Sequence, residues 1–258
     1  MKYTLFQETR AGKRPYNEDR LGCWQRDGAL MLAVADGMGG HEHGEVAAQI
    51  AVDRLGQAFE AEARPKIDLP ELFLRNTLSD AHAKIVEQAR VRKLSETPRT
   101  TVVACVVQDS KAWWMHVGDS RLYLIRKGRV AARTRDHTYV QQLVDAGKIR
   151  EEAAENHPDR NRVMRCLGGP QPPAMDPTQS MALEKDDILL LCSDGLWGPL
   201  TQRQILIGLI GRDPAHALPE LISLAEARAG AHCDNISVVA MHWQELESPA
   251  AAAVITGG

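Results

Sequence analysis

Residues 29–40 read ALMLAVADGMGG, and the rest of the sequence is interpreted outward from this stretch. Seven consecutive apolar residues at 29–35 are typical of a strand that is buried on both faces. Asp36 and the glycines after it end the strand at an abrupt turn. We therefore expect the Asp36 carboxylate at the end of a rigid buried strand, a position that suits a functional side chain.

The same arrangement of an apolar run and an aspartate occurs elsewhere in the chain. Asp119 follows WWMHVG, Asp194 follows LLLCS, and Asp234 precedes ISVVAMHW. Each aspartate alone is most simply a turn residue, because Asp-Gly and related dipeptides are common in turns. Carboxylates that meet at one point raise each other's pKa, and hard cations such as Mg²⁺ or Mn²⁺ remove that cost. Together, the aspartates favour a divalent metal site with oxygen ligands.

Apolar periodicity predicts the remaining elements and a fold of the α+β or α/β class. The expected strands cover residues 2–10, 19–25, 29–35, 100–108, 112–120, 121–128, 187–195 and 234–243. The expected helices cover residues 44–63, 69–94, 138–153, 201–211 and 214–230. We expect the strands between residues 100 and 128 to form a meander. In the helix at 69–94, the residues expected to face the core are Leu72, Leu78, Ile85 and Val86.

Composition narrows the class of protein. The 258 residues are 44% hydrophobic and carry a formal net charge of −3, so we expect a globular domain at 1–245 and no nucleic-acid binding. Neither a signal peptide nor an apolar membrane span is evident, and the five cysteines form no C-x-x-C pair. We expect a cytoplasmic monomer with reduced, buried thiols, no membrane contact and a flexible tail at 246–258.

Eight short motifs follow one another along the sequence. They are RPYNED at 14–19, VADGMGGH at 34–41, TT at 100–101, VGDSRLY at 117–123, TRDHTYV at 134–140, NRVMRCLG at 161–168, CSDGLW at 192–197 and DNISVV at 234–239. Each motif is weak alone, but their order and spacing resemble those of bacterial members of the protein phosphatase 2C family, which are metal-dependent serine/threonine phosphatases. The resemblance covers nearly the whole chain, and it implies a four-layer αββα sandwich of two antiparallel sheets between helices.

The resemblance also implies which residues bind two Mg²⁺ or Mn²⁺ ions. Asp36 would bridge both ions. Asp194 and Asp234 would complete the protein ligands of the first ion, and Glu18 and the carbonyl of Gly37 would bind the second. All five residues stand at the matching positions of this sequence.

Further residues take supporting roles by the same resemblance. Asp119, with Asp194, would hold a third and weaker metal ion. Asp19 is expected beside the ligands, orienting waters or neighbouring groups, and Asn235 is expected to support Asp234. Arg14 matches the arginine that binds the substrate phosphate, where its planar fork suits two phosphate oxygens; without its motif it would be interpreted as a surface arginine.

Two further features of the sequence each have more than one interpretation. His41 and His43 in GGHEHGE do not have zinc-ligand spacing, and His41 is expected at a helix start or beside the ligands. Animal members have histidine where this chain has Met38, so His41 is also a candidate proton donor to the leaving group. Residues 134–175, here called the flap, match a segment beside the active site. Its arginines could receive acidic substrate segments or serve only solubility and local structure; they are Arg160, Arg162 and Arg165.

The resemblance implies one-step hydrolysis of phosphoserine and phosphothreonine in proteins, by a hydroxide that bridges two metal ions. It also implies a separate serine/threonine kinase whose products the enzyme reverses. Two other classes of protein are alternatives: a phosphoprotein-binding module that has lost catalysis, and a hydrolase of small phosphate esters or nucleotides. The complete set of carboxylates argues against the first, and the absence of a P-loop or Rossmann glycine pattern argues against nucleotide binding.

Overall fold

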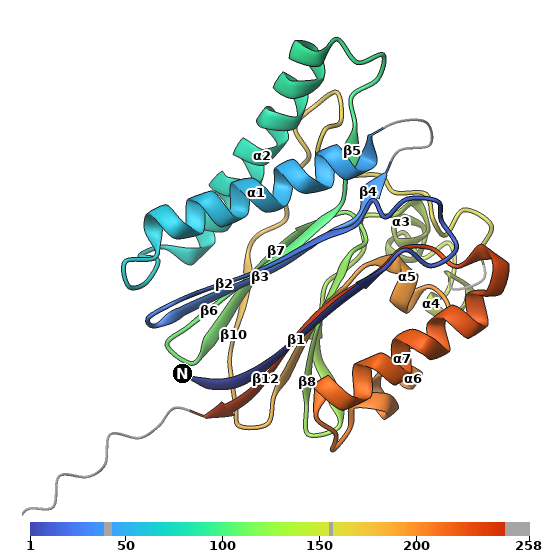
Figure 1. The fold of residues 1–258 in the computed structure, drawn as a ribbon. Helices are drawn as coiled ribbons and strands as arrows, with labels where there is room; N and C mark the ends of the chain where they lie inside the picture. Colours follow the sequence, from blue (N-terminus) through green and yellow to red (C-terminus); the bar gives the residue numbers. More distant parts are fainter. Residues whose placement is uncertain (39–42, 155–156, 246–258) are drawn as a thin grey trace, which may run out of the picture.

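A computed structural model describes residues 1–38, 43–154 and 157–245. Two five-stranded antiparallel sheets pack face to face, in the orders β1-β12-β11-β8-β9 and β10-β7-β6-β3-β2 (Figure 1). The strands of the first sheet are β1 (Lys2–Arg10), β12 (Ile236–Glu245), β11 (Ile188–Cys192), β8 (Arg121–Arg126) and β9 (Arg129–Arg133). Those of the second are β10 (Gln179–Ala182), β7 (Lys111–Val117), β6 (Val102–Gln108), β3 (Ala29–Ala35) and β2 (Arg20–Arg26). A short pair, β4 (Gly37–Met38) and β5 (Arg99–Thr100), extends the end of β3.

Helices cover the outer faces of both sheets (Figure 1). The second sheet is covered by α1 (Gly44–Glu62) and α2 (Pro70–Arg92). The first sheet is covered by α5 (Asp194–Trp197), α6 (Gln202–Leu209) and α7 (Pro214–Ala229), and a 3₁₀ turn (Gly230–His232) follows α7. The expected four-layer αββα sandwich is therefore confirmed.

Strand β3 shows why the layers form. All seven of its residues are buried. Met31 and Ala33 point into the core beneath α1 and α2, whereas Leu32 and Val34 point into the core between the two sheets. Because successive strand residues face opposite sides, a strand inside two cores must be apolar throughout. The strand predicted at 29–35 matches these bounds.

The expected meander is wrong. Strands β6 and β7 pair in one sheet, but β8 belongs to the other sheet, so the chain crosses between sheets at residues 118–120. Gly118 makes this crossing with φ +107°, and a Cβ there would lie 2.6 Å from the Cβ of Thr101. Periodicity cannot distinguish a crossing from a hairpin, because both join apolar strands through a turn. The crossing leaves Asp119 at the end of the sandwich.

Two of the four residues that were predicted to face the core from the helix at 69–94 are buried. Leu78 and Ile85 are fully buried, but Leu72 and Val86 are 48% and 39% exposed. At 100° per residue, Leu72 and Val86 fall off the stripe that contains Leu78 and Ile85. Thr77 and other residues complete the buried face instead.

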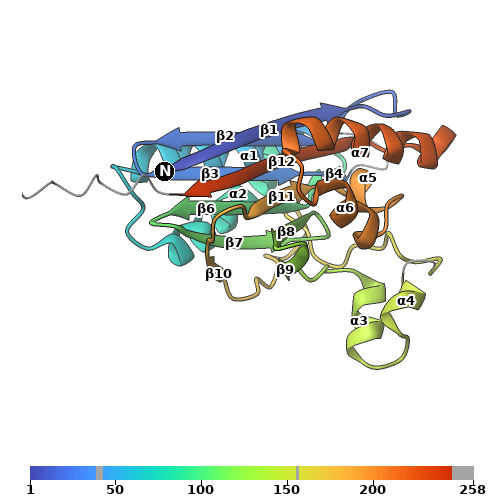
Figure 2. The ribbon, with the colours of Figure 1, turned by 90° about the horizontal axis from the view of Figure 1, so that it is seen from below.

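The flap differs from its expected form. The helix predicted at 138–153 is two helices, α3 (Tyr139–Asp145) and α4 (Glu151–Ala154), with Gly147 at φ +66° between them. Both helices project beyond the layered part of the molecule (Figure 2).

Of the cysteines, Cys105, Cys192 and Cys233 are buried, Cys23 and Cys166 are half-buried, and all five are free. No helix within the described ranges is apolar over a length sufficient for a membrane span.

Candidate metal centre and active site

A cavity of about 790 Å³ opens at the end of the sandwich where the chain crosses between layers. Its walls come from the loop before β2, the ends of β3 and β11, the crossing after β7 and the start of β12. Every residue that the sequence predicted as a metal ligand lines this cavity: Glu18, Asp36, Gly37, Asp119, Asp194 and Asp234. Segments more than 200 residues apart in the sequence therefore place their acidic groups around one space.

Two threonines hold the backbone of Asp36. The Asp36 carbonyl accepts hydrogen bonds from the amide of Thr101 at 2.8 Å and from Oγ1 of Thr100 at 2.9 Å. The Asp36 amide donates to Oγ1 of Thr101 at 3.3 Å. Both polar backbone groups of Asp36 are thus satisfied by the TT motif, which leaves the carboxyl to face the cavity.

Asp194 and Asp234 come together through a close backbone contact. Asp194 begins the short helix α5, and a Cβ added to Gly195 would lie 2.0 Å from the Asn235 carbonyl oxygen. Only glycine allows this approach between the end of β11 and the start of β12. The SDG and DN motifs therefore specify the packing that brings both aspartates to the cavity.

Glu18 lies against the backbone of two glycines. Its Oε2 is 2.7 Å from the position of a Cβ on Gly44, and its carbonyl is 2.7 Å from that of a Cβ on Gly37. Side chains at either glycine would displace Glu18. This contact places Glu18 and Gly37 side by side, the two groups that the resemblance assigns to the same metal ion.

Asp19 and Asn235 support the site from behind. Asp19 is 2% exposed and accepts a hydrogen bond from Ser193 at 2.8 Å, next to Asp194. The Asn235 side chain accepts from the amide of Glu18 at 2.8 Å and donates to the carbonyls of Ala11 and Tyr16 at 2.9 and 3.0 Å. Asn235 therefore organises the loop that carries Arg14 and Glu18, a role that its position in the sequence did not reveal.

The carboxyls in the cavity perturb one another. Burial raises the pKa of Asp36 well above its usual range, and the charges of Asp19 and Asp194 add to the effect. Burial also raises the pKa of Asp119 strongly, again with Asp194 contributing, and raises the pKa of Asp194 to about 6, with Asp234 contributing. Without a further cation, ionisation of the whole group is therefore unfavourable.

The donor chemistry fits hard divalent cations, because the cavity supplies carboxylates and a backbone carbonyl. Within the described ranges, however, no three His, Cys, Asp or Glu side chains already form a metal-binding group. The Asp194 carboxyl lies close enough to that of Asp36 for the two to affect each other's pKa, and Asp234 pairs with Arg14 at 2.6 Å. The ligand types therefore fit hard divalent cations.

Arg14 lies at the rim of the cavity, with 57% of its side chain exposed. Its contact with Asp234, together with the charges of Asp194 and Glu18, raises the pKa of its guanidinium. The guanidinium therefore lies within the cavity that the aspartates line and remains accessible to solvent.

The flap contributes different residues from those predicted. Asn161 and Val163 line the cavity, whereas Arg162 lies over the ring of Tyr139 and Arg165 pairs with Asp176 at 2.8 Å. Arg160 donates to the carbonyl of Gly198 at 3.3 Å. Substrate binding by the flap arginines stays a prediction. Asn161 and Val163 lie in the NRVMRCLG motif, but neither residue type signals a role in a cavity.

The two histidines of GGHEHGE have different outcomes. His41 lies outside the described residues, so its predicted role is not tested. His43 precedes α1 with φ 81° and lines the cavity, as does Met38. His43 does not have zinc-ligand spacing, and its side chain lies beside Glu45, with 3.7 Å between Nδ1 and Oε1.

Known proteins share this sequence pattern. The family model described as protein phosphatase 2C matches residues 8–218. The serine/threonine protein phosphatase PstP of Mycobacterium tuberculosis is 37% identical over 227 residues, which are 88% of this chain and 42% of PstP. The chain thus spans less than half the length of that relative. The serine/threonine phosphatase stp of Listeria monocytogenes is 37% identical over 193 residues, 74% of this chain and 76% of stp.

Solved structures share the fold. The structure of Stp1 from Staphylococcus aureus has a TM-score of 0.87 at 30% identity, covering 95% of this chain and 96% of that one. The structure of M. tuberculosis PstP/Ppp has a TM-score of 0.84 at 33% identity, covering 94% and 99%. The PstP catalytic domain in complex with two manganese ions has a TM-score of 0.78 at 31% identity, covering 95% and 100%. This chain belongs to the protein phosphatase 2C family of serine/threonine phosphatases.

Proposed function

We propose that this chain hydrolyses phosphoserine and phosphothreonine in proteins, using divalent cations held by the cavity carboxylates. The observation that carries the proposal is the convergence of the predicted acidic ligands, from five separate parts of the chain, on one cavity. The raised pKa values of Asp36, Asp119 and Asp194 support it, because such a cluster is stable in its ionised form only with added positive charge.

We assign the ions as Mg²⁺ or Mn²⁺, two in each site and a third more weakly bound. The two-manganese complex of the PstP catalytic domain supports the pair. Asp36 would contribute to both ions, with Asp194 and Asp234 on one side and Glu18 and Gly37 on the other. Asp119 would serve the third. When bound, such ions lower the pKa of a shared water, so that hydroxide is available to attack phosphorus in a single step.

The side chains of this protein provide the remaining functions. Arg14 is placed at the rim to bind two oxygens of the substrate phosphate through its planar fork. In the structure its guanidinium is paired with Asp234. A cation on Asp234 would compensate that carboxylate and let Arg14 turn to the phosphate. Asn161 and Val163 would contact the substrate beside the phosphate.

The biological setting follows from this chemistry. A phosphatase of this kind acts on proteins phosphorylated by another enzyme, so we propose a cognate serine/threonine kinase. We also propose that the protein works in the cytoplasm as a monomer. Its five free cysteines support a reducing compartment.

Phosphopeptide hydrolysis by the wild type and Asp36→Asn tests the proposed function. The wild type should release phosphate with Mn²⁺ or Mg²⁺ and stop when a chelator is added. Asp36→Asn should fold but lose cation-dependent turnover. Full activity of this variant, or turnover unaffected by the chelator, would rule the proposal out. A parallel assay with mononucleotides separates it from a hydrolase of small phosphate esters.

A further inference from the structure

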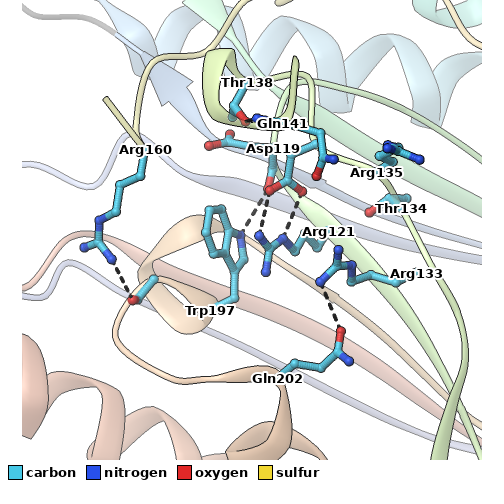
Figure 3. A network of polar contacts seen from close by, with 12 residues as sticks. Asp119, Arg121, Arg133, Thr134, Arg135, Thr138, Gln141, Arg160, Trp197 and Gln202 are labelled. Atoms are coloured by element: carbon cyan, nitrogen blue, oxygen red, sulfur yellow. Dashed lines mark hydrogen bonds and ion pairs between the residues drawn. The ribbon is translucent and has the colours of Figure 1, made fainter. Parts of the chain in front are cut away.

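Asp119 is held by a set of contacts that its predicted metal-binding role does not explain. The carbonyl of Asp119 accepts a hydrogen bond from Nε1 of Trp197 at 3.0 Å (Figure 3). The preceding Gly118 is bonded on both sides, because its carbonyl accepts from the amide of His137 at 2.9 Å and its amide donates to Nδ1 of that histidine at 3.2 Å. The backbone that carries the Asp119 carboxylate is therefore fixed from α5 and from the start of the flap.

Trp197 is fixed in turn by Arg121. The guanidinium carbon of Arg121 lies 3.5 Å from the centroid of the indole ring, a contact typical of cation–π stacking. Nε and Nη2 of Arg121 donate to the two carboxylate oxygens of Asp136 at 2.9 and 2.6 Å, and Nη1 donates to the hydroxyl of Tyr123 at 3.0 Å. The guanidinium thus has a partner for each nitrogen and for one face.

This arrangement is buried and specific to arginine. The side chains of Arg121 and Asp136 are only 14% and 8% exposed. A lysine ammonium is a point charge without a planar fork or a flat face, so it can replace neither the bidentate contact nor the stacking. Arg121, Asp136 and Trp197 were not assigned a function from the sequence, although they lie in the motifs VGDSRLY, TRDHTYV and CSDGLW, respectively.

The arrangement joins two parts of the site. Trp197 ends the helix that Asp194 begins, so α5 carries one predicted ligand and bonds the backbone of another, Asp119. Asp136 lies near the start of the flap. The first residues of the flap also bond its later part near Val163, through the Thr138–Val163 bridge and the bond from the amide of Met164 to the carbonyl of His137.

We propose that Arg121, Trp197 and Asp136 form a positioning unit that holds Asp119 in the geometry needed to bind its divalent cation. The proposal rests on the proposed function, because that function assigns Asp119 to the third metal ion. Arg121 is not among the residues that line the cavity, so we infer that it acts through Trp197 and the backbone of Asp119.

Mn²⁺ titration, followed by calorimetry and by electron paramagnetic resonance, tests this proposal without relying on turnover. Arg121→Lys and Trp197→Phe should weaken the weakest Mn²⁺ site about 10-fold, as expected when a residue that orients a metal ligand is changed. Trp197→Phe keeps a ring for Arg121 and removes only the indole donor. Arg133→Lys is the matched control. Arg133 lies nearby and bonds Gln202 (Figure 3) and Glu151, but it contacts neither Trp197 nor the backbone of Asp119.

A double-mutant cycle separates positioning from a general structural effect. If Arg121 acts through Asp119, then Arg121→Lys should cause no additional loss of Mn²⁺ affinity when Asp119 is already Asn. Unchanged Mn²⁺ binding in the single variants, or the same 10-fold loss in the Asp119→Asn background, would overturn the proposal. If Arg121→Lys does not fold, the cycle with Trp197→Phe decides.

The activity of the wild type distinguishes the two proposals. Wild-type hydrolysis of a phosphopeptide with Mn²⁺, together with unchanged Mn²⁺ binding in Trp197→Phe and Arg121→Lys, would refute the positioning unit alone. Wild-type protein that binds Mn²⁺ but does not hydrolyse the phosphopeptide would refute the proposed function, while a 10-fold loss of affinity in both variants would still support the positioning unit.

Discussion

Strand β11 has an aspartate just before its start and another just after its end, and their environments differ. Asp187 is fully buried, receives both arms of the Arg126 guanidinium at 2.9 and 2.6 Å, and accepts from the amide of Glu184 at 2.8 Å. Asp194, at the other end, lies in the cavity with Asp36 and Asp234, whose charges contribute to the shifts in this group of carboxyls. One carboxylate has its counter-charge built into the chain, whereas the other lies among further acids.

The difference teaches how to distinguish a structural aspartate from a functional one. A buried carboxylate with a bidentate arginine and a backbone donor has its charge and geometry satisfied, and it can serve the fold alone. A buried carboxylate that faces other carboxylates keeps a charge that only protons or an added cation can neutralise. Both aspartates adjoin the same apolar strand, so the strand itself does not separate them.

The largest expected effect comes from Asp194→Asn. Removing this ligand should lower phosphopeptide turnover by about 10³-fold or more, because a metal-activated water contributes several kcal/mol to such reactions. The fold should persist, since the change removes a carboxylate from an unfavourable cluster. Steady-state turnover with Mn²⁺ measures the loss. Activity within a factor of two of the wild type would show that Asp194 is as structural as Asp187.

Asp187→Asn should give the opposite result. Breaking this buried pair leaves Arg126 without its full partner and should lower the free energy of unfolding by about 3 kcal/mol. Turnover per folded molecule should stay within a factor of two. Urea denaturation and an activity assay on the same sample check both parts. A stable but inactive variant would contradict the contrast between the two ends of β11.

The stabilisation by Mn²⁺ should be greater at pH 8 than at pH 5. The pKa of Asp19 is raised to about 7 and that of Asp194 to about 6, mainly by burial, so the folded state holds protons that the unfolded state has released. With a chelator present, the free energy of unfolding of the protein should therefore fall as the pH rises from about 4 to 7, by on the order of a few kcal/mol. Cations that bind the ionised groups restore this stability.

A histidine requires a control in that experiment. Burial lowers the pKa of His116 to about 4. The contribution of His116 to the stability of the folded protein is therefore lost as the pH falls below about 6.5, the ordinary pKa of histidine. Its effect has the opposite sign to that of the carboxyls. The quantity to measure is therefore the difference between unfolding free energies with Mn²⁺ and with chelator at each pH. A difference that is equal at pH 5 and pH 8 would contradict the carboxylate account.

Arg14→Lys has the smallest expected effect. It should raise the KM for a phosphopeptide about 10-fold, the loss expected for one charge-assisted contact, with a smaller change in kcat. Lysine retains the charge but not the two-pronged contact. Steady-state kinetics at saturating Mn²⁺ measure the change. An unchanged KM would assign Arg14 to its contact with Asp234 alone.

Much of the fold was predictable, since β3 and β11 read as continuous apolar runs and α1 shows helical periodicity. The membership of each sheet was not, because periodicity does not say that the chain crosses between sheets at Gly118. Short strands such as β10 were missed because four residues hold too little pattern.

For the site, the four aspartates were found because aspartates at the ends of apolar strands stand out when they are taken together, whereas Glu18 and Gly37 came from the resemblance of the motifs. The ordered motifs added their assignment to ions. Asn235 was expected beside Asp234, but its bonds to the loop that carries Arg14 and Glu18 could not be predicted from the sequence. Trp197 and Arg121 were not found from the sequence, because a tryptophan and an arginine carry no such pattern. Their roles became visible only when the structure showed that Trp197 bonds the carbonyl of Asp119 and that Arg121 stacks on its ring.

A crystal structure of the protein grown with Mn²⁺, with anomalous scattering to locate the metal, tests the central claim most directly. The account predicts manganese ions in the cavity with the Asp36 carboxylate between two of them, and with Asp234 released from Arg14. No anomalous signal at the cavity, with the Arg14–Asp234 pair still intact, would contradict it.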